Sequence, residues 1–389
     1  MRSAFRQKRF FPILCLNPNA LFLSAEHLLL GAFLLATAVQ LAFWLGPFLK
    51  FARHRPAPPP EVPPEPVSII ICARNEAENL KENLPYFLSQ DYPDYEIIVV
   101  NDQSSDKSLE VLLEIQQKSP ILRLISITTK DARGKKAALS KGIKAAKHEI
   151  LLLSDADCRP ASSKWLEQTQ AFIRDRAEIG LGYSPYLRGK GMLNAFIRFE
   201  TVYSAIQYLS FAFVGMPYMG VGRNLAYRSY LFHRAGGFAM HADVTSGDDD
   251  LFINQVATAS NTRVIMSPDA FVFSRAKSSW RGYYRQKRRH LSTGSRYRWK
   301  HKLLLGALSA SHFGHYVFGL ASILFYNLAI IVIFNYLARI VVVSTVYFLT
   351  LRKLRDPSLF FWVPIFDTLY ILYYLLFAPA LFKTKEPWT

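Results

Sequence analysis

The sequence predicts an α/β domain built on a parallel sheet and attached to several transmembrane α-helices. Two observations support this fold class. Apolar, strand-like segments alternate four times with amphipathic helical segments between residues 67 and 157, which is typical of a parallel sheet covered by helices. Long stretches with almost no charge lie before and after the polar middle of the 389-residue chain. The chain is therefore expected to combine a sizeable α/β core with membrane helices.

Four apolar stretches are long enough to cross the hydrocarbon core of a bilayer, which is about 30 Å thick. They are residues 28–49 and 303–327, which lack Asp, Glu, Lys and Arg, residues 328–351, which contain only Arg339, and residues 359–382, which contain only Asp367. The first stretch is too long, and too poor in small flanking residues, for a cleaved signal peptide. We therefore predict an integral membrane protein with an N-terminal segment over residues 1–27, one span before the polar middle and three after it.

Basic residues predict the orientation of these spans. Four crossings place three clusters on the same side of the membrane, namely Lys50, Arg53 and Arg55, then Lys300 and Lys302, then Arg352, Lys353 and Arg355. The excess of basic residues identifies that side as the cytoplasm, so we expect a cytoplasmic middle domain at the cell (inner) membrane. The basic residues Arg2, Arg6, Lys8 and Arg9 would lie outside, against the rule.

The formal net charge of +18 suits anionic membrane lipids or a phosphate-bearing substrate as partners. No nucleic-acid partner is expected, because no known nucleic-acid-binding motif occurs in the sequence. Three cysteines (Cys15, Cys72 and Cys158) are too few for a disulfide framework. We expect Cys72 and Cys158 to be small buried residues.

Two further features of the apolar stretches yield predictions. Arg339 and Asp367 are costly inside a membrane, and residues of this kind are usually paired, so we predict an ion pair between the third and fourth spans. Residues 201–222 are also uncharged, but Pro217 and several glycines interrupt them. We predict a helix lying against the membrane plane there, near the functional site.

The polar middle, residues 67–300, is predicted to be one α/β domain. The proline-rich segment within residues 50–66 cannot be helical and is expected to be a stiff linker. The predicted strands are 67–73, 95–100, 122–128 and 149–157, and the predicted helices are about 76–90, 105–118 and 134–146. Ligands of such sheets bind beyond the carboxyl ends of the strands, so the residues that follow each strand are the site candidates.

Polar residues follow three of these strands, and parallel strands would bring them to one crevice. They are Asn75 and Glu76 after the first strand, Asp102 after the second, and Asp155 and Asp157 after the fourth. Carboxylate oxygens are the ligands that Mg²⁺ and Mn²⁺ prefer, and a metal held by one or two carboxylates suits a diphosphate. Isolated acid pairs of this kind are common at turns, but polar residues at three of the four strand ends favour a site.

Three adjacent acids, Asp248, Asp249 and Asp250, stand in a strongly basic chain. Like charges this close raise one another's pKa, which suits a carboxylate that acts as a base near neutral pH. The alternative is structural, because acids at the start of a helix cap it and complement its dipole. Both interpretations can hold together.

Five stretches of the chain resemble one family. They are VSIIICARNEAENL, IIVVNDQSSD, GKKAAL, SDAD and GDDDLF, in this order between residues 67 and 252. Together they are similar to the motifs of the membrane-bound family 2 glycosyltransferases, and the likeness covers roughly residues 66–295. The resemblance implies the GT-A fold, a Rossmann-like nucleotide-sugar-binding catalytic domain, and inverting sugar transfer that depends on Mg²⁺ or Mn²⁺.

The resemblance also assigns site residues. It assigns nucleotide-sugar contacts to Ala73, Asn75, Glu76, Asp102, Lys135 and Asp155, and metal ligation to Asp155 and Asp157. In GDDDLF, Gly247 replaces the family's Glu, Asp248 takes the place of the base and Asp250 that of the second acid. A shift of one residue would make Asp249 the base, so both remain candidates.

Two later stretches extend the resemblance towards the acceptor and the diphosphate. Asn224 belongs to a segment, GVGRNLAYRS, that in the family lines the donor and acceptor subsites. QKRRH keeps Gln286 and Arg289 of a family motif but has His290 in place of its Trp. Arg289 suits a diphosphate because guanidinium binds phosphate oxygens in a bidentate manner. The same basic run could instead be an interfacial helix that contacts anionic lipid.

The expected function is transfer of a sugar from a nucleotide-sugar donor, expected to be UDP-linked, to a membrane-associated lipid or glycan acceptor. One alternative is a processive polysaccharide synthase, which four spans and the replacement of Trp by His290 disfavour. Another is an inactive membrane scaffold or a subunit of a polymer channel, which the retained acids disfavour. The sequence does not select the sugar.

Overall fold

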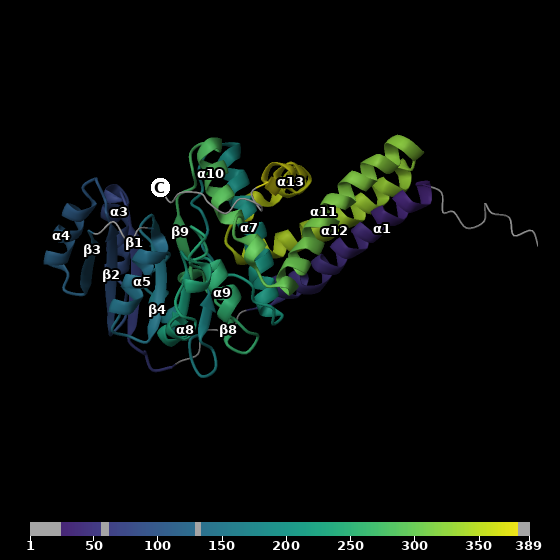
Figure 1. Ribbon diagram of the computed structural model, residues 1–389. Coiled ribbons are helices and arrows are strands. Elements are labelled where there is room, and N and C mark those ends of the chain that lie inside the picture. The colour runs from purple at the N-terminus through teal and green to yellow at the C-terminus, as the bar shows by residue number, and fades with distance from the viewer. Residues whose placement is uncertain (1–24, 56–61, 129–133, 380–389) are drawn as a thin grey trace, which may run out of the picture.

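The computed structural model describes residues 25–55, 62–128 and 134–379. It has two parts, a globular α/β domain and an arm of long helices (Figure 1). Most of the predicted N-terminal segment, with Cys15 and the four basic residues near the N-terminus, lies outside the described residues, and so does the middle of the proline-rich linker.

A seven-stranded mixed sheet forms the centre of the globular domain. In spatial order its strands are β3 (Leu122–Ile127), β2 (Tyr95–Asp102), β1 (Val67–Ala73), β4 (Ile150–Asp155), β7 (Leu225–Arg228), β6 (Ile179–Leu181) and β8 (Thr262–Val264). The first four are parallel, whereas β7 runs antiparallel to β4 and β6. All seven residues of β1 are buried, as expected for an apolar, β-branched strand at the centre of a covered sheet.

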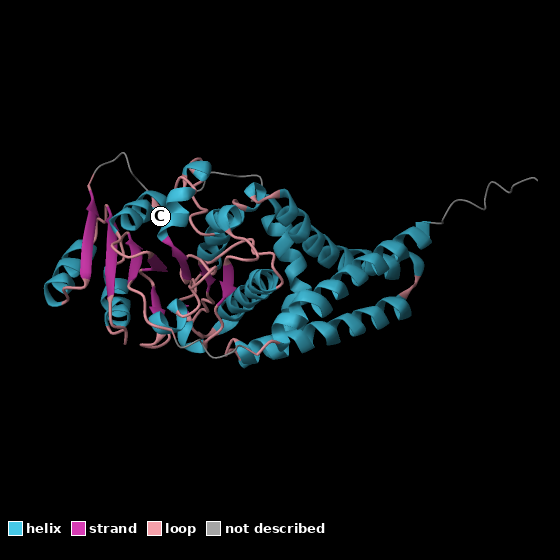
Figure 2. Ribbon diagram, turned by 90° about the horizontal axis from the view of Figure 1, so that it is seen from below, coloured by secondary structure: helices cyan, strands magenta, loops and turns pink. Residues whose placement is uncertain are grey.

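Helices follow the strands as the alternating pattern predicts. The helices of the domain are α3 (Ala77–Leu88), α4 (Ser108–Lys118), α5 (Lys135–Ala145), α6 (Trp165–Gln170), α7 (Gly191–Phe213), α8 (Ser229–Arg234), α9 (Asp250–Val256) and α10 (Trp280–Leu291), with short 3₁₀ turns at Ala239–His241, Pro268–Ala270 and Gly294–Arg296. Figure 2 shows the strands confined to this domain and the arm built from helices alone. The predicted α/β class is confirmed.

The fourth predicted strand, 149–157, is wrong at its end, because its last residues lead into a small second sheet. The strand β4 stops at Asp155 instead of Asp157. The chain then turns into β5 (Cys158–Pro160), which pairs antiparallel with β9 (Val272–Ser274). Asp157 therefore sits in the turn between the two sheets. Cys72 and Cys158 are both buried free cysteines, as predicted.

The arm contains the predicted apolar helices. Its elements are α1 (Ala25–Phe43), a π-helical turn (Trp44–Phe48), α2 (Leu49–Arg53), α11 (Trp299–Tyr326), α12 (Ala329–Lys353), a 3₁₀ segment (Pro357–Trp362) and α13 (Val363–Phe377). Four continuous segments, Ala25–Arg53, Trp299–Tyr326, Ala329–Lys353 and Pro357–Phe377, have the length and composition of membrane spans. In Figure 1, α13 is seen nearly end-on whereas α1, α11 and α12 run lengthwise, so α13 crosses the others.

A polar cluster joins the arm helices and contains the predicted ion pair. Arg339 of α12 is fully buried and contacts Asp367 of α13, with 2.6 Å between Nη1 and Oδ2. Gln40 of α1 accepts a hydrogen bond from the same guanidinium at 3.0 Å, and Tyr316 of α11 donates to Asp367 at 2.7 Å. The cluster therefore fixes the position of each helix relative to the other three.

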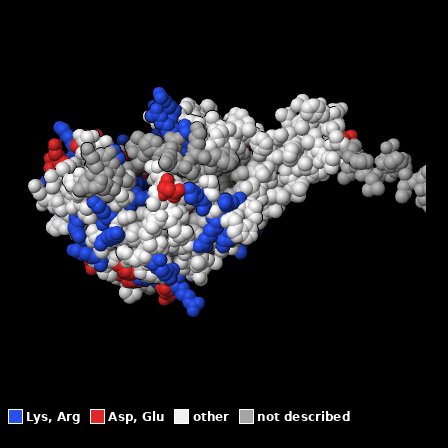
Figure 3. Space-filling view, viewed as in Figure 1, with Lys and Arg blue, Asp and Glu red and all other residues white. Residues whose placement is uncertain are grey.

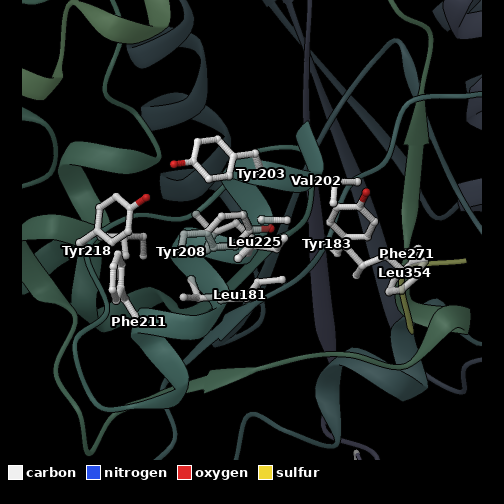
Figure 4. Packing of buried hydrophobic residues seen from close by; sticks show 14 of the residues in the cluster. Leu181, Tyr183, Val202, Tyr203, Tyr208, Phe211, Tyr218, Leu225, Phe271 and Leu354 are labelled. Carbon is white, nitrogen blue, oxygen red and sulfur yellow. The ribbon is translucent and has the colours of Figure 1, made fainter. Parts of the chain in front are cut away.

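The helix predicted over residues 201–222 lies earlier in the chain, as α7. Gly191 at its start and Gly215 just beyond its end both have φ of +85°, and a left-handed glycine after the last turn is a common helix stop. Figure 4 shows Val202, Tyr203, Tyr208 and Phe211 of this helix packed together with the sheet residues Leu181 and Leu225.

The outer side of α7 meets the arm. The rings of Tyr203 and Trp44 stack with 6.3 Å between their centroids, and the guanidinium of Arg198 pairs with Asp356 beyond α12. The helix is thus a buried connector between the domain and the arm. The interfacial prediction missed this because the sequence does not show that both faces are covered.

Candidate active site

The carboxyl ends of β1 and β2 form the first wall of the candidate site. Asp102 is fully buried, and its Oδ2 accepts a hydrogen bond from the Gly134 backbone N–H at 3.2 Å. Arg74 approaches the same oxygen at 4.0 Å. The other oxygen, Oδ1, has no hydrogen-bond partner among the described residues. An unsatisfied buried acceptor is costly, so this oxygen is suited to a ligand N–H.

The loop after β1 shapes the same wall. Ala73 is buried at the end of the strand. Asn75 has a left-handed backbone with φ of +56° and accepts a hydrogen bond from the Ser105 N–H at 2.8 Å. Burial raises the pKa of Glu76, and the carboxylates of Asp157 and Asp155 add to this effect. Glu76 is therefore close to both acids that follow β4.

Asp155 and Asp157 have the spacing and ligand chemistry to hold a divalent cation. Their carboxylate oxygens and the Sγ of Cys158 lie within 4.8 Å of one another. Burial and the charge of Asp157 raise the pKa of the Cys158 thiol well above its usual value, so the sulfur is a neutral group that donates to Asp157. A hard cation such as Mg²⁺ or Mn²⁺ fits the two carboxylates and does not need the thiol.

Lys135, the first residue of α5, connects two of the predicted site acids. Its Nζ lies 2.8 Å from Oδ1 of Asp155 and 3.3 Å from Oδ2 of Asp248. Burial opposes the charge of the ammonium, but the two acids outweigh it and raise the pKa of Lys135 well above its usual value. Burial likewise opposes the Asp155 carboxylate, yet Lys135 lowers its pKa overall. Residues far apart in the sequence therefore meet at one charged centre.

The three adjacent acids have three different environments. Asp248 is 5% exposed and faces Lys135. Asp249 caps α9, and its two oxygens accept backbone N–H groups of Gly222 at 2.8 Å and of Asp250 at 2.7 Å. Burial, followed by repulsion from the two neighbouring acids, raises the pKa of Asp249 to about 7. The predicted helix cap and the predicted charged site are therefore both present. Asp249 provides the cap, and Asp248 belongs to the charged site.

Asp250 is the acid that ties this segment to the arm. The hydroxyl of Tyr297, two residues before α11, donates to its Oδ2 at 2.8 Å, and Thr293 donates to the same oxygen. Burial raises the pKa of Asp250, although these hydrogen bonds oppose the rise. The carboxylate is thus held by protein groups of the segment that leads into α11.

Gly247, which precedes the three acids, has a backbone conformation and surroundings that disfavour a side chain. Its φ is +96°, and a Cβ placed on it would lie 2.5 Å from Cδ1 of Leu251 and 2.8 Å from Cγ. A side chain is therefore excluded by both backbone conformation and space. The turn that presents Asp248 to Lys135 depends on this glycine.

The structure places the remaining predicted residues around this centre. Gln286, Arg289 and His290 all belong to α10, and the charge of Arg289 contributes to the lowered pKa of Asp155. Asn224 is 3% exposed and its polar atoms contact protein groups, namely the Trp165 indole N–H and the carbonyls of Tyr183 and Ala270. The hydrogen bonds of the Asn224 side chain are therefore made to groups inside the domain.

Comparison with known proteins identifies the family. Residues 68–207 match the model of "Glycosyl transferase family 2", and residues 150–381 match that of "Glycosyl transferase family group 2". The second match alone spans more than half of the chain. The chain is a family 2 glycosyltransferase. The resemblance predicted from five motifs is confirmed, and so is enzymatic sugar transfer as the class of activity.

Relatives of this glycosyltransferase match it over part of their length. A poly-beta-1,6-N-acetyl-D-glucosamine synthase of Staphylococcus epidermidis is 37% identical over 93 residues, which are 24% of this chain and 22% of the synthase. The protein named "Probable glycosyltransferase YdaM" of Bacillus subtilis is 26% identical over 235 residues, which are 57% of this chain and 54% of that protein. The chain thus spans about a fifth to a half of these relatives.

A solved structure supports the fold. The mannosyltransferase PcManGT from Pyrobaculum calidifontis, determined in complex with GDP-Man and Mn²⁺, superposes with a TM-score of 0.55. It is 18% identical, and the alignment covers 88% of this glycosyltransferase and 99% of that chain. Its GT-A architecture agrees with the mixed sheet described above.

Arg223, which was not predicted as a site residue, lies beside the acids of the glycosyltransferase. Its guanidinium stacks on the ring of Tyr186 at 4.4 Å, and its charge acts on both Asp155 and Asp157. Within the described residues its Nη1 has no hydrogen-bond partner. The one available signal was its position directly before Asn224 in an already suspected stretch.

Proposed function

We propose that this glycosyltransferase inverts the anomeric carbon of a nucleotide sugar, expected to be UDP-linked, while transferring the sugar to a membrane-associated lipid or glycan. Asp248 is proposed as the base. The observation that carries the proposal is the Lys135 ammonium, which joins Asp248 to Asp155, a predicted metal ligand, at 3.3 and 2.8 Å. A base and a diphosphate site must adjoin in a direct displacement, because both act at one carbon.

The choice of Asp248 over Asp249 rests on what each carboxylate contacts. Both oxygens of Asp249 accept backbone N–H groups, so reorienting them would break the cap of α9. Asp248 contacts a side-chain ammonium at the crevice instead. The pKa of about 7 for Asp249 suits a base, but a base must first reach the proton that it removes.

The proposed reaction is a single displacement. The acceptor hydroxyl oxygen forms a bond to C1 of the sugar, and its proton passes to the Asp248 carboxylate. The bond between C1 and the diphosphate oxygen breaks, and its electron pair leaves with the diphosphate. Lys135, Arg223 and Arg289 supply positive charge around the departing group.

Mg²⁺ or Mn²⁺ would be held by Asp155 and Asp157, and when bound it would neutralise charge on the diphosphate. The free Oδ1 of Asp102 is proposed to accept an N–H of the nucleobase. Glu76 and Asn75 complete that wall. Gln286 and His290 on α10 remain proposed acceptor or diphosphate residues. Asn224 and Asp250, whose polar atoms contact protein groups, are proposed to act on the acceptor or diphosphate site only through the groups that they hold in place.

The membrane placement is a further part of the proposal. Of the four candidate spans, α1, α11 and α12 run lengthwise together and would cross the cell membrane, whereas α13 lies across them. The catalytic domain would then lie in the cytoplasm, where nucleotide sugars are made. Figure 3 shows an arm almost without charged side chains, and Lys and Arg gathered on the domain and at the root of the arm. Basic residues at that end of the spans support the orientation.

A processive polysaccharide synthase is the second candidate, favoured by the similarity to poly-beta-1,6-N-acetyl-D-glucosamine synthases. The centre of the arm argues against passage of a polymer through one chain. Arg339, Asp367 and Gln40 fill it, and each is at most 2% exposed. A single-sugar transfer to a membrane acceptor is therefore preferred.

Release of nucleoside diphosphate by the purified enzyme in lipid vesicles tests the proposal. A panel of UDP- and GDP-sugars is supplied with Mg²⁺, with Mn²⁺ or with chelator, in the presence of a lipid extract. We expect one donor to be consumed, with loss of release in chelator and one sugar per acceptor. Long products would support the synthase, and no metal-dependent release from any donor would favour an inactive scaffold.

A further inference from the structure

A hollow lined by basic side chains opens where the arm joins the domain. Its volume is about 660 Å³. Its basic lining residues are Arg53, His54 and Arg55 at the end of α2 and Arg352 and Lys353 at the end of α12. The described residues around it include no Asp or Glu. Burial, followed by the charge of Lys353, lowers the pKa of His54, so the positive charge comes from the three arginines and Lys353. Because α2 and α12 are far apart in the sequence, the fold itself gathers these four charges, and their mutual repulsion disfavours the arrangement unless an anion binds.

The acid nearest in the chain does not neutralise this hollow. Asp356 accepts from Nε of Arg198 at 2.9 Å and from the Ser358 hydroxyl at 2.9 Å. Lys353 is held at the base of the hollow, where it donates to the Phe51 carbonyl and lies 4.6 Å from the centre of the Phe51 ring. Among the described residues, no Asp or Glu pairs with Arg53, Arg55 or Arg352, so their guanidinium groups can meet an anion from solvent or membrane.

An apolar groove begins beside the hollow. Its volume is about 480 Å³, and it runs between α12 and the start of α13. Its lining includes Val341, Ser344, Phe348, Phe360 and Pro364. The guanidinium of Arg352, which lines the hollow, lies 5.5 Å from the centre of the Phe348 ring, which lines the groove. The two sites therefore adjoin along one side of α12.

We propose that the hollow and the groove together bind one anionic phospholipid. The phosphate headgroup occupies the basic hollow, where guanidinium groups suit phosphate oxygens, and an acyl chain lies in the groove. Basic pockets between membrane helices on the cytoplasmic side are suited to anionic headgroups. A free phosphate would fill the hollow and leave the apolar groove unused. The inference rests on the membrane placement proposed above and is independent of the sugar-transfer step.

Lipid retention by the full-length protein tests this site. The protein is reconstituted in vesicles of phosphatidylcholine and phosphatidylglycerol, extracted in mild detergent, and examined by native mass spectrometry for bound lipid. We expect the parent to retain phosphatidylglycerol preferentially. Arg53→Gln combined with Arg352→Gln should reduce that retention by at least about tenfold. The matched control is Arg174→Gln with Arg176→Gln, which removes the same charge from exposed positions of the domain.

A second variant separates a lipid from a free anion. Ser344→Trp fills the groove and leaves the basic hollow intact, so a lipid should be lost whereas a phosphate ion should not. Excess inorganic phosphate should fail to displace the lipid. Thermal unfolding of each variant confirms that it is folded.

Retention by the Arg53 and Arg352 variant equal to that of the control would overturn the proposal. So would displacement by phosphate without any effect of Ser344→Trp. Because donor and acceptor are omitted from this experiment, loss of the lipid site and failure of the proposed transferase are separate results.

Discussion

Substitution of Gly247 by Ala probes the turn that presents the acids. A left-handed backbone costs a residue with a Cβ about 1–2 kcal/mol, and Gly247 has φ of +96°. The new Cβ would also lie 2.5 Å from Cδ1 of Leu251, and forced overpacking costs about 1–3 kcal/mol. We therefore expect Gly247→Ala to lower the free energy of unfolding by about 2–5 kcal/mol.

A double-mutant cycle separates the two contributions. Leu251→Ala removes Cγ and Cδ1, the two atoms nearest the new Cβ, and leaves only Leu251 Cβ at 3.2 Å. Alone, it should cost about 2–5 kcal/mol through the cavity it creates. In combination, the clash disappears and the backbone strain remains, so the pair should be less destabilising than the sum by about 1–3 kcal/mol.

The free energies of the cycle are measured by urea unfolding in detergent, with tryptophan fluorescence as the signal. Parent and variants are compared with one common m-value, the slope of unfolding free energy against urea concentration. Distant, independent substitutions add to within about 0.5 kcal/mol. Additivity of Gly247→Ala and Leu251→Ala, or a neutral Gly247→Ala, would refute the steric explanation for the missing Glu. The rate of nucleoside-diphosphate release should also fall in Gly247→Ala, because the substitution distorts the turn and moves Asp248 away from Lys135.

Three other predictions follow from the buried charges. Asp367→Asn leaves Arg339 unpaired and should lower the free energy of unfolding by about 3–5 kcal/mol. Exchanging the two charges should lower it less. If the exchange is more destabilising than either single change, the two residues do not act as a pair. The Asp249 carboxyl has a pKa of about 7 in the folded protein and of about 4 in the unfolded chain. Between these pH values only the folded protein keeps the proton, so the free energy of unfolding should fall as the pH rises from about 4 to 7. Relative to Asp249→Asn, the fall should be up to about 1.4 kcal/mol per pH unit. Equal pH slopes in urea unfolding would contradict this. Tyr297→Phe removes a hydrogen bond to the Asp250 carboxylate and should lower the urea midpoint by the equivalent of about 1.5–3 kcal/mol; an unchanged midpoint would show that Thr293 suffices.

Features set by local pattern were predictable from the sequence. The strand β1 has an unbroken apolar run, and every residue in it is buried. The four predicted apolar stretches contain no Asp, Glu, Lys or Arg except for Arg339 and Asp367. Because each of these charges is costly in an apolar interior, an ion pair between them was the expected arrangement. The strand ends were predictable in kind, because parallel strands place their carboxyl ends at one edge.

Features set by long-range packing were not predictable. The position of α7 depends on contacts with both the sheet and Trp44 of the arm, which the apolar run at 201–222 does not encode. The bridge from Asp155 through Lys135 to Asp248 joins three separate segments. The sequence shows that Gly247 departs from the motif but not why. The structure supplies a reason, because Leu251 lies one turn away and leaves no room for a side chain at this position.

The most direct test of the account compares Asp248→Asn and Asp249→Asn in donor binding and in turnover. The donor identified in the release panel is titrated calorimetrically, and nucleoside-diphosphate release is measured with acceptor present. We expect Asp248→Asn to bind the donor within a few-fold of the parent and to lose at least about 10²-fold in turnover, whereas Asp249→Asn should retain most of its turnover. Substantial turnover in Asp248→Asn, with its loss in Asp249→Asn, would contradict the assignment of the base.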